Sequence, residues 1–342
     1  MRAIVFLFIL LLFIKPVSSK EILYSGEYKI EFSSENITKK KEEVINEIKY
    51  NSFRKIIISL LTNSEYNKLN KNIDIDFINT FIFAVDIYEE KINNNTYTSK
   101  ITFAYDNSKI INFFINNNIH FIPYEPEEYL LIIFDQKLFS EKILSKDNRF
   151  YRFLSDNKFK YKYFQLPNLD INDRFIINKE DFFLKKIKHY DELINKYKNT
   201  NIILIHSVSE SNKTKIYSYV NEFNNFKKLD DVSYKIIDYE FFFNSLHNKA
   251  LDYWKKKNSV NPSLINNLNC KIKTINLSEL KAIKDIINKN KMINRIEPNE
   301  ISYNNSNYKL VYFGKFDILV KSLKKDKILI SLLDNSCNIK IL

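Results

Sequence analysis

Two aspartates are the best-placed pair of acidic side chains for a chemical role. Asp170 and Asp173 lie in the segment Leu-Asp-Ile-Asn-Asp, shortly after a predicted strand that ends at Pro167. Ligand sites in α/β folds form where strands end, so the pair could contact a cation or a substrate amine. Asp and Asn side chains also cap backbone N–H groups in turns and at helix starts. The sequence leaves both roles open.

The single tryptophan is the second candidate for ligand contact. Trp254 is followed by Lys255 and two further lysines near the end of a predicted helix. An indole beside cations can stack on a sugar or a peptide, or lie at a membrane interface. The alternative is a core tryptophan in the last helical turn, where lysines favour the negative end of the helix dipole.

Composition and spacing exclude several familiar sites. With only 2 glycines, a glycine-rich phosphate loop is impossible, and no Gly-x-Ser-x-Gly or His-Glu-x-x-His motif occurs. None of the 4 histidines lies three or four residues from another histidine or a cysteine, which excludes a local zinc site. We therefore expect no metal, no cofactor and no recognisable catalytic residue. His206 ends a predicted buried strand and is expected to be structural, whereas His189 and His247 are expected at the surface.

The amino terminus has the pattern of a secretory signal peptide. A short basic start, Met1-Arg2, precedes an unbroken apolar run over Ala3–Ile14, which ends at Lys15-Pro16. Small side chains before Lys20 predict cleavage after Ser19. The run is too short for a membrane anchor, which needs about 20 apolar residues. We expect a protein exported to the periplasm through the Sec pathway, with no transmembrane segment after cleavage.

The basic net charge of +12 gives little support for nucleic-acid binding. Lysine accounts for 47 of the 53 basic residues and is interleaved with 41 acids. Phosphate-reading surfaces favour arginine, whose planar fork grips phosphate at two points. Asn, Ile, Phe and Tyr are also abundant and share A/T-rich codons with Lys. We therefore interpret the excess as codon bias and expect no nucleic-acid partner.

The mature chain divides into three segments of different pattern. Residues 20–125 and 269–342 each read as β-α-β-β-α-β, the split βαβ or ferredoxin-like plan. Residues 126–268 alternate continuous apolar strands with helices, which indicates a layered α/β sheet. The predicted class is α+β, with two ferredoxin-like modules flanking an α/β domain. Because glycine is so rare, we expect asparagine at the left-handed turn positions.

The two cysteines could form a disulfide in the last segment. In the β-α-β-β-α-β plan the first and fourth strands are antiparallel neighbours. Cys270 opens the predicted first strand and Cys337 lies just past the fourth, so both fall at one edge. An oxidising compartment would allow them to pair.

The ordered set of segments resembles a bacterial secreted family known as domain of unknown function 2066. The matching pieces are Ile22–Tyr28, Ile56–Thr62, Tyr129–Phe134, Leu166–Asp173, Leu193–Ile205, Tyr253–Lys255 and Leu310–Leu319. The middle segment is similar to the amino-terminal domain of the periplasmic protein TolB, with a strand, a Leu-Pro turn, and a helix feeding a buried strand. The family has no established activity, so the resemblance implies location and fold only.

Two classes of function remain. The first is a non-catalytic binding or assembly module that contacts another envelope protein or a cell-wall component. The second is a secreted hydrolase with dispersed acids, which predicts a deep polar pocket near Asp170, Asp173 and His206. Carboxylates that are distant in sequence leave this alternative open.

Overall fold

A computed structural model describes residues 21–210, 212–301, 305–333 and 336–342. The predicted signal peptide and its cleavage site lie outside these residues. The described residues divide into two compact units, one formed by residues 21–123 together with 259–342, the other by residues 124–258. Each unit contains both helices and strands, so the predicted α+β class is confirmed. Among the described residues, no helix is long and apolar enough to cross a membrane.

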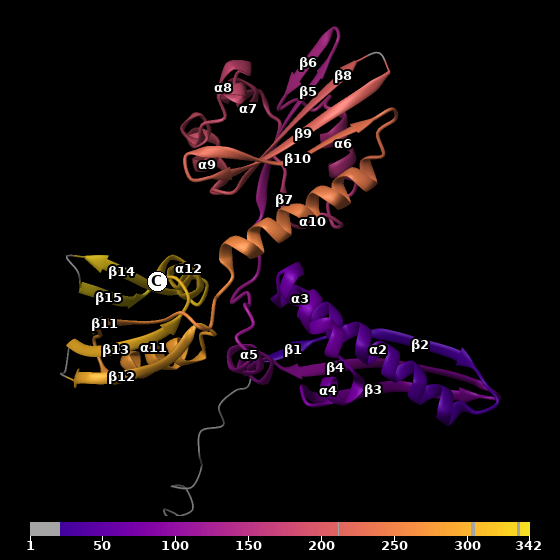
Figure 1. Cartoon of the computed structure of the whole chain (residues 1–342), viewed down its shortest axis with the longest axis vertical. Helices are drawn as coiled ribbons and strands as arrows, with labels where there is room; N and C mark the ends of the chain where they lie inside the picture. The colour runs from indigo at the N-terminus through magenta and orange to yellow at the C-terminus, as the bar shows by residue number, and fades with distance from the viewer. Residues whose placement is uncertain (1–20, 211, 302–304, 334–335) are drawn as a thin grey trace, which may run out of the picture. The chain divides into compact units, whose positions relative to one another are not determined.

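The amino-terminal part of the first unit is an antiparallel sheet covered by helices (Figure 1). Its strands are β1 (Ile22–Tyr24), β2 (Tyr28–Ser33), β3 (Ile82–Asn93) and β4 (Thr96–Asp106). The helices are α2 (Ile37–Leu60), α3 (Asn63–Leu69), η1 (Asn70–Asn72), α4 (Ile75–Asn79) and α5 (Asn107–Asn116). Strand β4 is central, with β1 and β2 in succession along one edge and β3 along the other. The predicted closing strand at Ile119–Ile122 is wrong: only the bridge Phe121–Val260 forms there.

The carboxyl-terminal part contains one more strand than the sequence predicts. Its strands are β11 (Ile265–Lys273), β12 (Ile293–Ile301), β13 (Asn305–Phe313), β14 (Ile328–Leu333) and β15 (Ser336–Ile341). Helices α11 (Leu277–Lys289) and α12 (Phe316–Lys325) connect them. The order is β12-β13-β11-β15-β14, so β15 separates the two strands that were expected to be neighbours. It pairs parallel with β11 and antiparallel with β14.

The middle unit is a mixed sheet with helices on both faces (Figure 1). Its strands are β5 (Tyr129–Lys137), β6 (Ser140–Ile143), β7 (Phe164–Gln165), β8 (Ile202–Glu210), β9 (Lys213–Glu222) and β10 (Asn225–Tyr234). Its helices are α6 (Arg149–Asp156), α7 (Ile171–Ile176), α8 (Lys179–Leu184), η2 (Ile187–Tyr190), α9 (Asp191–Tyr197) and α10 (Tyr239–Asn258). The parallel strands β5 and β8 form its buried centre, as their continuous apolar runs predict.

Aromatic side chains join the helices to the two faces of this sheet. Phe150 of α6 packs against Phe242 and Phe243 of α10 on one face. On the other face, Phe182 of α8 packs against Phe134 and His206. The predicted segment 126–268 runs past this unit, because residues 259–268 belong to the first unit and include the start of β11.

The expectation that asparagine replaces glycine in left-handed turns holds at a minority of positions. Asn94 at the β3–β4 turn and Asn118 after α5 have positive φ angles. The other non-glycine residues with positive φ are Glu89, Leu144, Leu169, Lys185, Lys198, Phe223 and Lys327. The non-glycine residues with positive φ adopt a backbone conformation that costs L-residues energy, and most of them are not asparagine.

Candidate functional site

The middle unit contains a pocket of about 1040 Å³ beside the short strand β7. This volume is slightly above the range of about 300–1000 Å³ that is typical of small-molecule sites. The lining residues are Glu128, Lys146, Tyr151, Arg152, Ser155, Lys158, Phe159, Lys162, Phe164, Gln165, Leu166, Pro167, Asn168, Leu169 and Tyr197. They come from α6 and its flanking loops, from β7 and the segment after it, and from the end of α9.

An interruption of the sheet edge creates this space. On the outer edge of β5, β7 pairs only with Tyr129 and Leu130, and β6 begins its pairing at Phe134. Between them the Tyr151 hydroxyl accepts a hydrogen bond from the Ile133 N–H and donates one to the Leu131 carbonyl, both at 2.9 Å. A side chain of α6 therefore satisfies the backbone that a longer β7 would have paired.

Helix α6 is held in this position by its cap. Asn148 precedes the helix, and its side chain accepts a hydrogen bond from the Phe150 N–H. The same side chain, which is fully buried, also reaches the Ile133 carbonyl at 3.4 Å. Capping and sheet contact together orient the helix, so that Tyr151 points to the sheet while Arg152 stays exposed at the pocket.

The charge on the pocket lining is strongly unequal. Four cations line it, Lys146, Arg152, Lys158 and Lys162, against one carboxylate, Glu128. Within the described chain, the three lysines form no ion pair with a carboxylate. Arg152 contacts Asp147 at 3.7 Å, but both side chains are largely exposed. These cations are thus available to an anionic ligand.

The opposite wall is largely apolar and is fixed by hydrogen bonds. It is formed by Leu166, Pro167 and Leu169, with Phe164 at its base. The Tyr197 hydroxyl accepts a hydrogen bond from the Asn168 N–H at 2.7 Å. Burial, together with its hydrogen bond to Asp173, raises the pKa of Tyr197 to about 12. The phenol therefore remains protonated and continues to donate to Asp173.

Asp170 and Asp173 lie directly behind this wall and do not line the pocket. Asp173 is fully buried and accepts hydrogen bonds from the Leu169 N–H at 2.8 Å and the Tyr197 hydroxyl at 2.6 Å. Asp170 caps α7 through the Asp173 N–H, and this bond, reinforced by Lys196, lowers the pKa of Asp170. Lys196 contacts both carboxylates. The pair performs the capping role, with its oxygens already engaged.

The polar pocket near Asp170, Asp173 and His206 that the hydrolase alternative predicts is not formed by these residues, because none of them lines the pocket. His206 does not line the pocket; its Nε2 lies 3.1 Å from Oε1 of Gln136, and its ring stacks on Phe134. Burial lowers the pKa of His206 to about 4, so the ring is neutral near pH 7. His247 was expected at the surface, but its Nε2 is buried against Tyr163 and Phe164, which corrects that prediction.

Trp254 is a core residue and not a surface platform. Its side chain is only 2% exposed, and its ring meets the Tyr124 ring edge-on with centroids 5.4 Å apart. Lys255 is also buried, and burial lowers its pKa. The proposal that Trp254 and Lys255 present a sugar- or peptide-stacking surface is therefore wrong.

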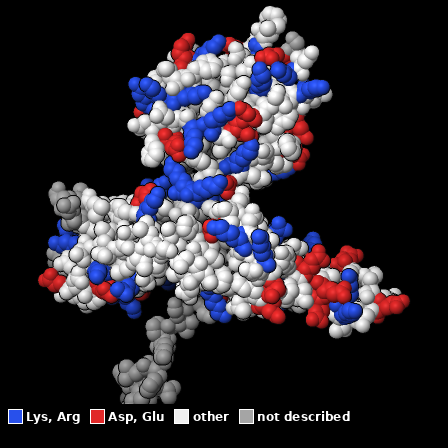
Figure 2. All heavy atoms as spheres, viewed as in Figure 1, with Lys and Arg blue, Asp and Glu red and all other residues white. Residues whose placement is uncertain are grey.

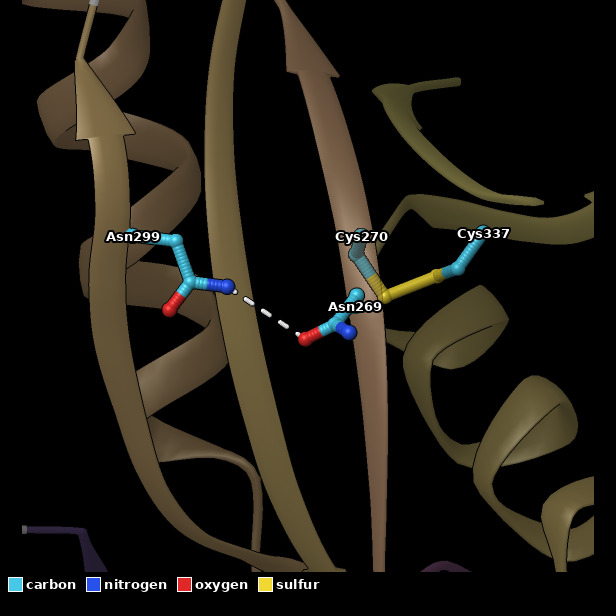
Figure 3. Close-up of a disulfide and its surroundings, with 4 residues drawn as sticks. All are labelled: Asn269, Cys270, Asn299 and Cys337. Atoms are coloured by element: carbon cyan, nitrogen blue, oxygen red, sulfur yellow. Dashed lines mark hydrogen bonds between the residues drawn. A yellow bond between two sulfur atoms is a disulfide. The ribbon is translucent and has the colours of Figure 1, made fainter.

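Cys270 and Cys337 are joined by a disulfide in the first unit (Figure 3). They are paired residues of the parallel strands β11 and β15, with Cα atoms 4.3 Å apart, and both are buried. The reason given by the sequence needs correction, since Cys270 lies inside its strand and Cys337 belongs to an additional fifth strand. On the other side of β11, Asn269 accepts a hydrogen bond from Asn299 at 3.3 Å.

Sequence reasoning missed two polar groupings in the middle unit. One is the lysine and arginine lining of the pocket. The other lies at the ends of β5 and β8, where Arg149 contacts buried Asp135 at 3.1 Å and Ser209 at 2.7 Å. The second could have been suspected, because Asp135 follows an apolar strand. The first carries no signal in a chain with 53 basic residues.

The described residues contain no cluster of three or more His, Cys, Asp or Glu side chains that could hold a metal ion. Comparisons with protein families, curated proteins and solved structures find no match to the chain.

Proposed function

We propose that the chain is an exported, non-catalytic binding protein of the bacterial cell envelope, and that its middle unit holds a ligand with an anionic group and an apolar portion. One observation carries the proposal: a pocket in which four cations and an apolar wall accompany a single carboxylate. The three pocket lysines, which form no ion pair with a carboxylate in the described chain, favour a phosphate or carboxylate group, as does the exposed Arg152. The apolar wall favours a ligand that also buries hydrocarbon or an aromatic ring.

Export is supported by the leader pattern and by the cysteine pair. Disulfides persist in oxidising compartments such as the periplasm and are rare in the cytosol. The loop closed by Cys270 and Cys337 spans 67 residues. In the chain-entropy treatment, closing such a loop stabilises the fold by roughly 4 kcal/mol.

The strand orders of the two sheets in the first unit support a proposal for the fold of each part. In the carboxyl-terminal sheet, removing β15 from the order would leave β12-β13-β11-β14, which is the arrangement of a ferredoxin-like module. In the amino-terminal sheet, β1 and β2 together take the place of the first strand of that plan. Strands β3 and β4 take the places of the second and the third. On this basis we propose the domain of unknown function 2066 family, with a TolB-like middle domain and an envelope protein or cell-wall component as partner.

Calorimetric titration with phenyl phosphate tests the pocket, because this probe joins an anion to an aromatic ring. We expect saturable binding to the full chain, weaker binding of inorganic phosphate, and none of phenol. Lys158→Glu should weaken phenyl phosphate binding at least about tenfold. The matched control is Lys235→Glu, an exposed lysine of the same unit that does not line the pocket. Equal affinities for the two variants would contradict the proposal.

Mass spectrometry of the protein isolated from its native cells tests export separately. The expected species lacks residues 1–19 and carries Cys270 and Cys337 as a disulfide. An intact amino terminus with two free thiols would contradict the assigned location and leave the pocket proposal to its own test.

A further inference from the structure

The turn that joins β5 to β6 carries two large apolar side chains in full contact with solvent. Leu138 is 80% exposed and Phe139 is 94% exposed. Two-residue hairpin turns normally use Gly, Asn or Asp, whose backbones suit the turn and whose side chains favour water. Leu138 and Phe139 instead place two adjacent apolar side chains at one turn, where they form a small exposed apolar projection.

The hairpin presents these side chains on a rigid base. Strands β5 and β6 pair from Phe134–Ile143 to Lys137–Ser140, directly up to the turn. Strand β5 is also paired with β8 along the buried centre of the sheet. The tip projects from the middle unit in Figure 1, and the same projection is uncharged in Figure 2. A fixed apolar projection, and not a groove, is what the molecule offers here.

Cations surround the base of the projection. Lys137 is exposed and precedes the tip, and Lys142 follows it on β6, with its Nζ 3.5 Å from the Asp147 carbonyl. Lys179 of α8 lies beside β6, where it pairs with Glu141 at 2.6 Å. Asp135, on the strand below, is paired with Arg149. Within the described chain Lys137 and Lys142 form no ion pair with a carboxylate, whereas Glu141 and Asp135 are both paired, so the charge left over near the tip is positive.

We propose that the β5–β6 hairpin is a membrane-contact element that inserts Leu138 and Phe139 into the interface of an anionic lipid bilayer. Apolar side chains enter the boundary between headgroups and acyl chains, while lysines at the base attract anionic headgroups. A projecting apolar tip suits a deformable lipid surface better than a protein surface, which would need a matching cavity. With only two inserted side chains, binding should be weak and reversible.

Sedimentation with vesicles tests this proposal on the full chain. Vesicles of phosphatidylcholine and phosphatidylglycerol in equal parts should bind the protein more strongly than vesicles of phosphatidylcholine alone. Leu138→Ser with Phe139→Ser should lower partitioning at least about tenfold, because it removes the inserted apolar surface. Residues 1–19 are present or absent equally in every variant, so the difference between variants reports the hairpin.

Phe223 provides a matched control in the same unit. It is 86% exposed at the β9–β10 turn, and β9 runs antiparallel to β8, so this turn lies at the opposite end of the sheet. Phe223→Ser should leave partitioning unchanged. Tryptophan fluorescence should shift to the blue on vesicle addition for Phe139→Trp and stay constant for Phe223→Trp.

Three outcomes would overturn the proposal. The first is equal partitioning of the hairpin variant and the unmodified chain. The second is a fluorescence response at position 223 equal to that at position 139. The third is a blue shift of Phe139→Trp in vesicle-free envelope extract with none on vesicles, which would assign the tip to a protein partner.

Discussion

Two neighbouring regions of the middle unit contrast in how their charged groups are used. Behind the pocket wall, Asp170 and Asp173 are engaged by backbone N–H groups, by Tyr197 and by Lys196. In front of it, the pocket lysines make no ion pair within the described chain. The first region uses charge to hold a loop and a helix in place. The second leaves charge available, so we assign binding to the cations and not to the acids.

The largest expected effect comes from removing the buried member of the acidic pair. Asp173→Ala leaves the Leu169 N–H and the Tyr197 hydroxyl without this acceptor, while Lys196 keeps its contact with Asp170. We expect the free energy of unfolding to fall by about 3 kcal/mol, because buried donors lose their partner. Urea unfolding followed by circular dichroism measures it. Asp231→Ala, which removes an exposed partner of Lys228, should cost less than about 0.5 kcal/mol. Similar losses of unfolding free energy in Asp173→Ala and Asp231→Ala would contradict the structural role assigned to Asp173.

Reversing two pocket charges should lower ligand affinity and leave the stability of the fold unchanged. Lys158→Glu with Lys162→Glu places two carboxylates where the ligand anion is expected, so phenyl phosphate affinity should fall by about 100-fold or more. Because both lysines are exposed, the free energy of unfolding should change by less than about 0.5 kcal/mol. Calorimetry and urea unfolding on the same sample measure the two quantities. Loss of stability without loss of phenyl phosphate affinity would contradict the assignment of ligand binding to the pocket lysines.

Added salt should weaken ligand binding at the pocket more than it weakens the stabilising contacts of Asp173, and this difference should be smaller than the effects of the substitutions. Exposed charges are screened within about 10 Å at 0.1 M ionic strength, whereas buried pairs are screened less. Raising sodium chloride from about 0.05 M to about 0.5 M should weaken phenyl phosphate binding severalfold. The stability difference between Asp173→Ala and the unmodified chain should persist. A salt-independent affinity would show that the pocket cations do not contact the anion.

The smallest expected effect concerns acid stability. Capping of the Asp173 N–H and the contact with Lys196 lower the pKa of Asp170 in the folded state. Its contribution is therefore complete above the unfolded pKa of about 3.9 and is lost as pH falls through the lower folded value. Asp170→Asn keeps a capping side chain but does not titrate. Its loss of stability below about pH 4 should be shallower than that of the unmodified chain, as followed by circular dichroism during acid titration.

Parts of the fold that depend on local pattern were predictable. The apolar runs of β5 and β8 are continuous because both faces are covered, and that signal does not depend on distant residues. The helices α6 and α10 follow from their own sequences. Strand β15 (Ser336–Ile341) was missed because the four-strand plan left no place for it, whereas the structure pairs it with β11 on one side and β14 on the other. The shortening of β7 was missed because Tyr151, distant in sequence, satisfies the neighbouring backbone of β5.

The lysines that line the pocket could not be predicted from the sequence. Lys146, Lys158 and Lys162 are ordinary lysines by sequence, and only the fold brings them to one cavity. Asp170 and Asp173 drew attention because they follow a predicted strand, yet in the structure Asp170 caps α7 through the Asp173 N–H. Their position in the sequence therefore identified a structural feature, while the proposed binding residues had no distinctive position.

Amine labelling of the full chain tests whether an anionic ligand occupies the pocket beside β7. Acetic anhydride is applied with and without saturating phenyl phosphate, and each lysine is quantified by mass spectrometry. Bound ligand should protect Lys146, Lys158 and Lys162 and leave Lys188 and Lys235, which lie outside the pocket, labelled as before. Equal labelling of all five lysines in the presence of bound ligand would contradict this assignment of the ligand to the pocket.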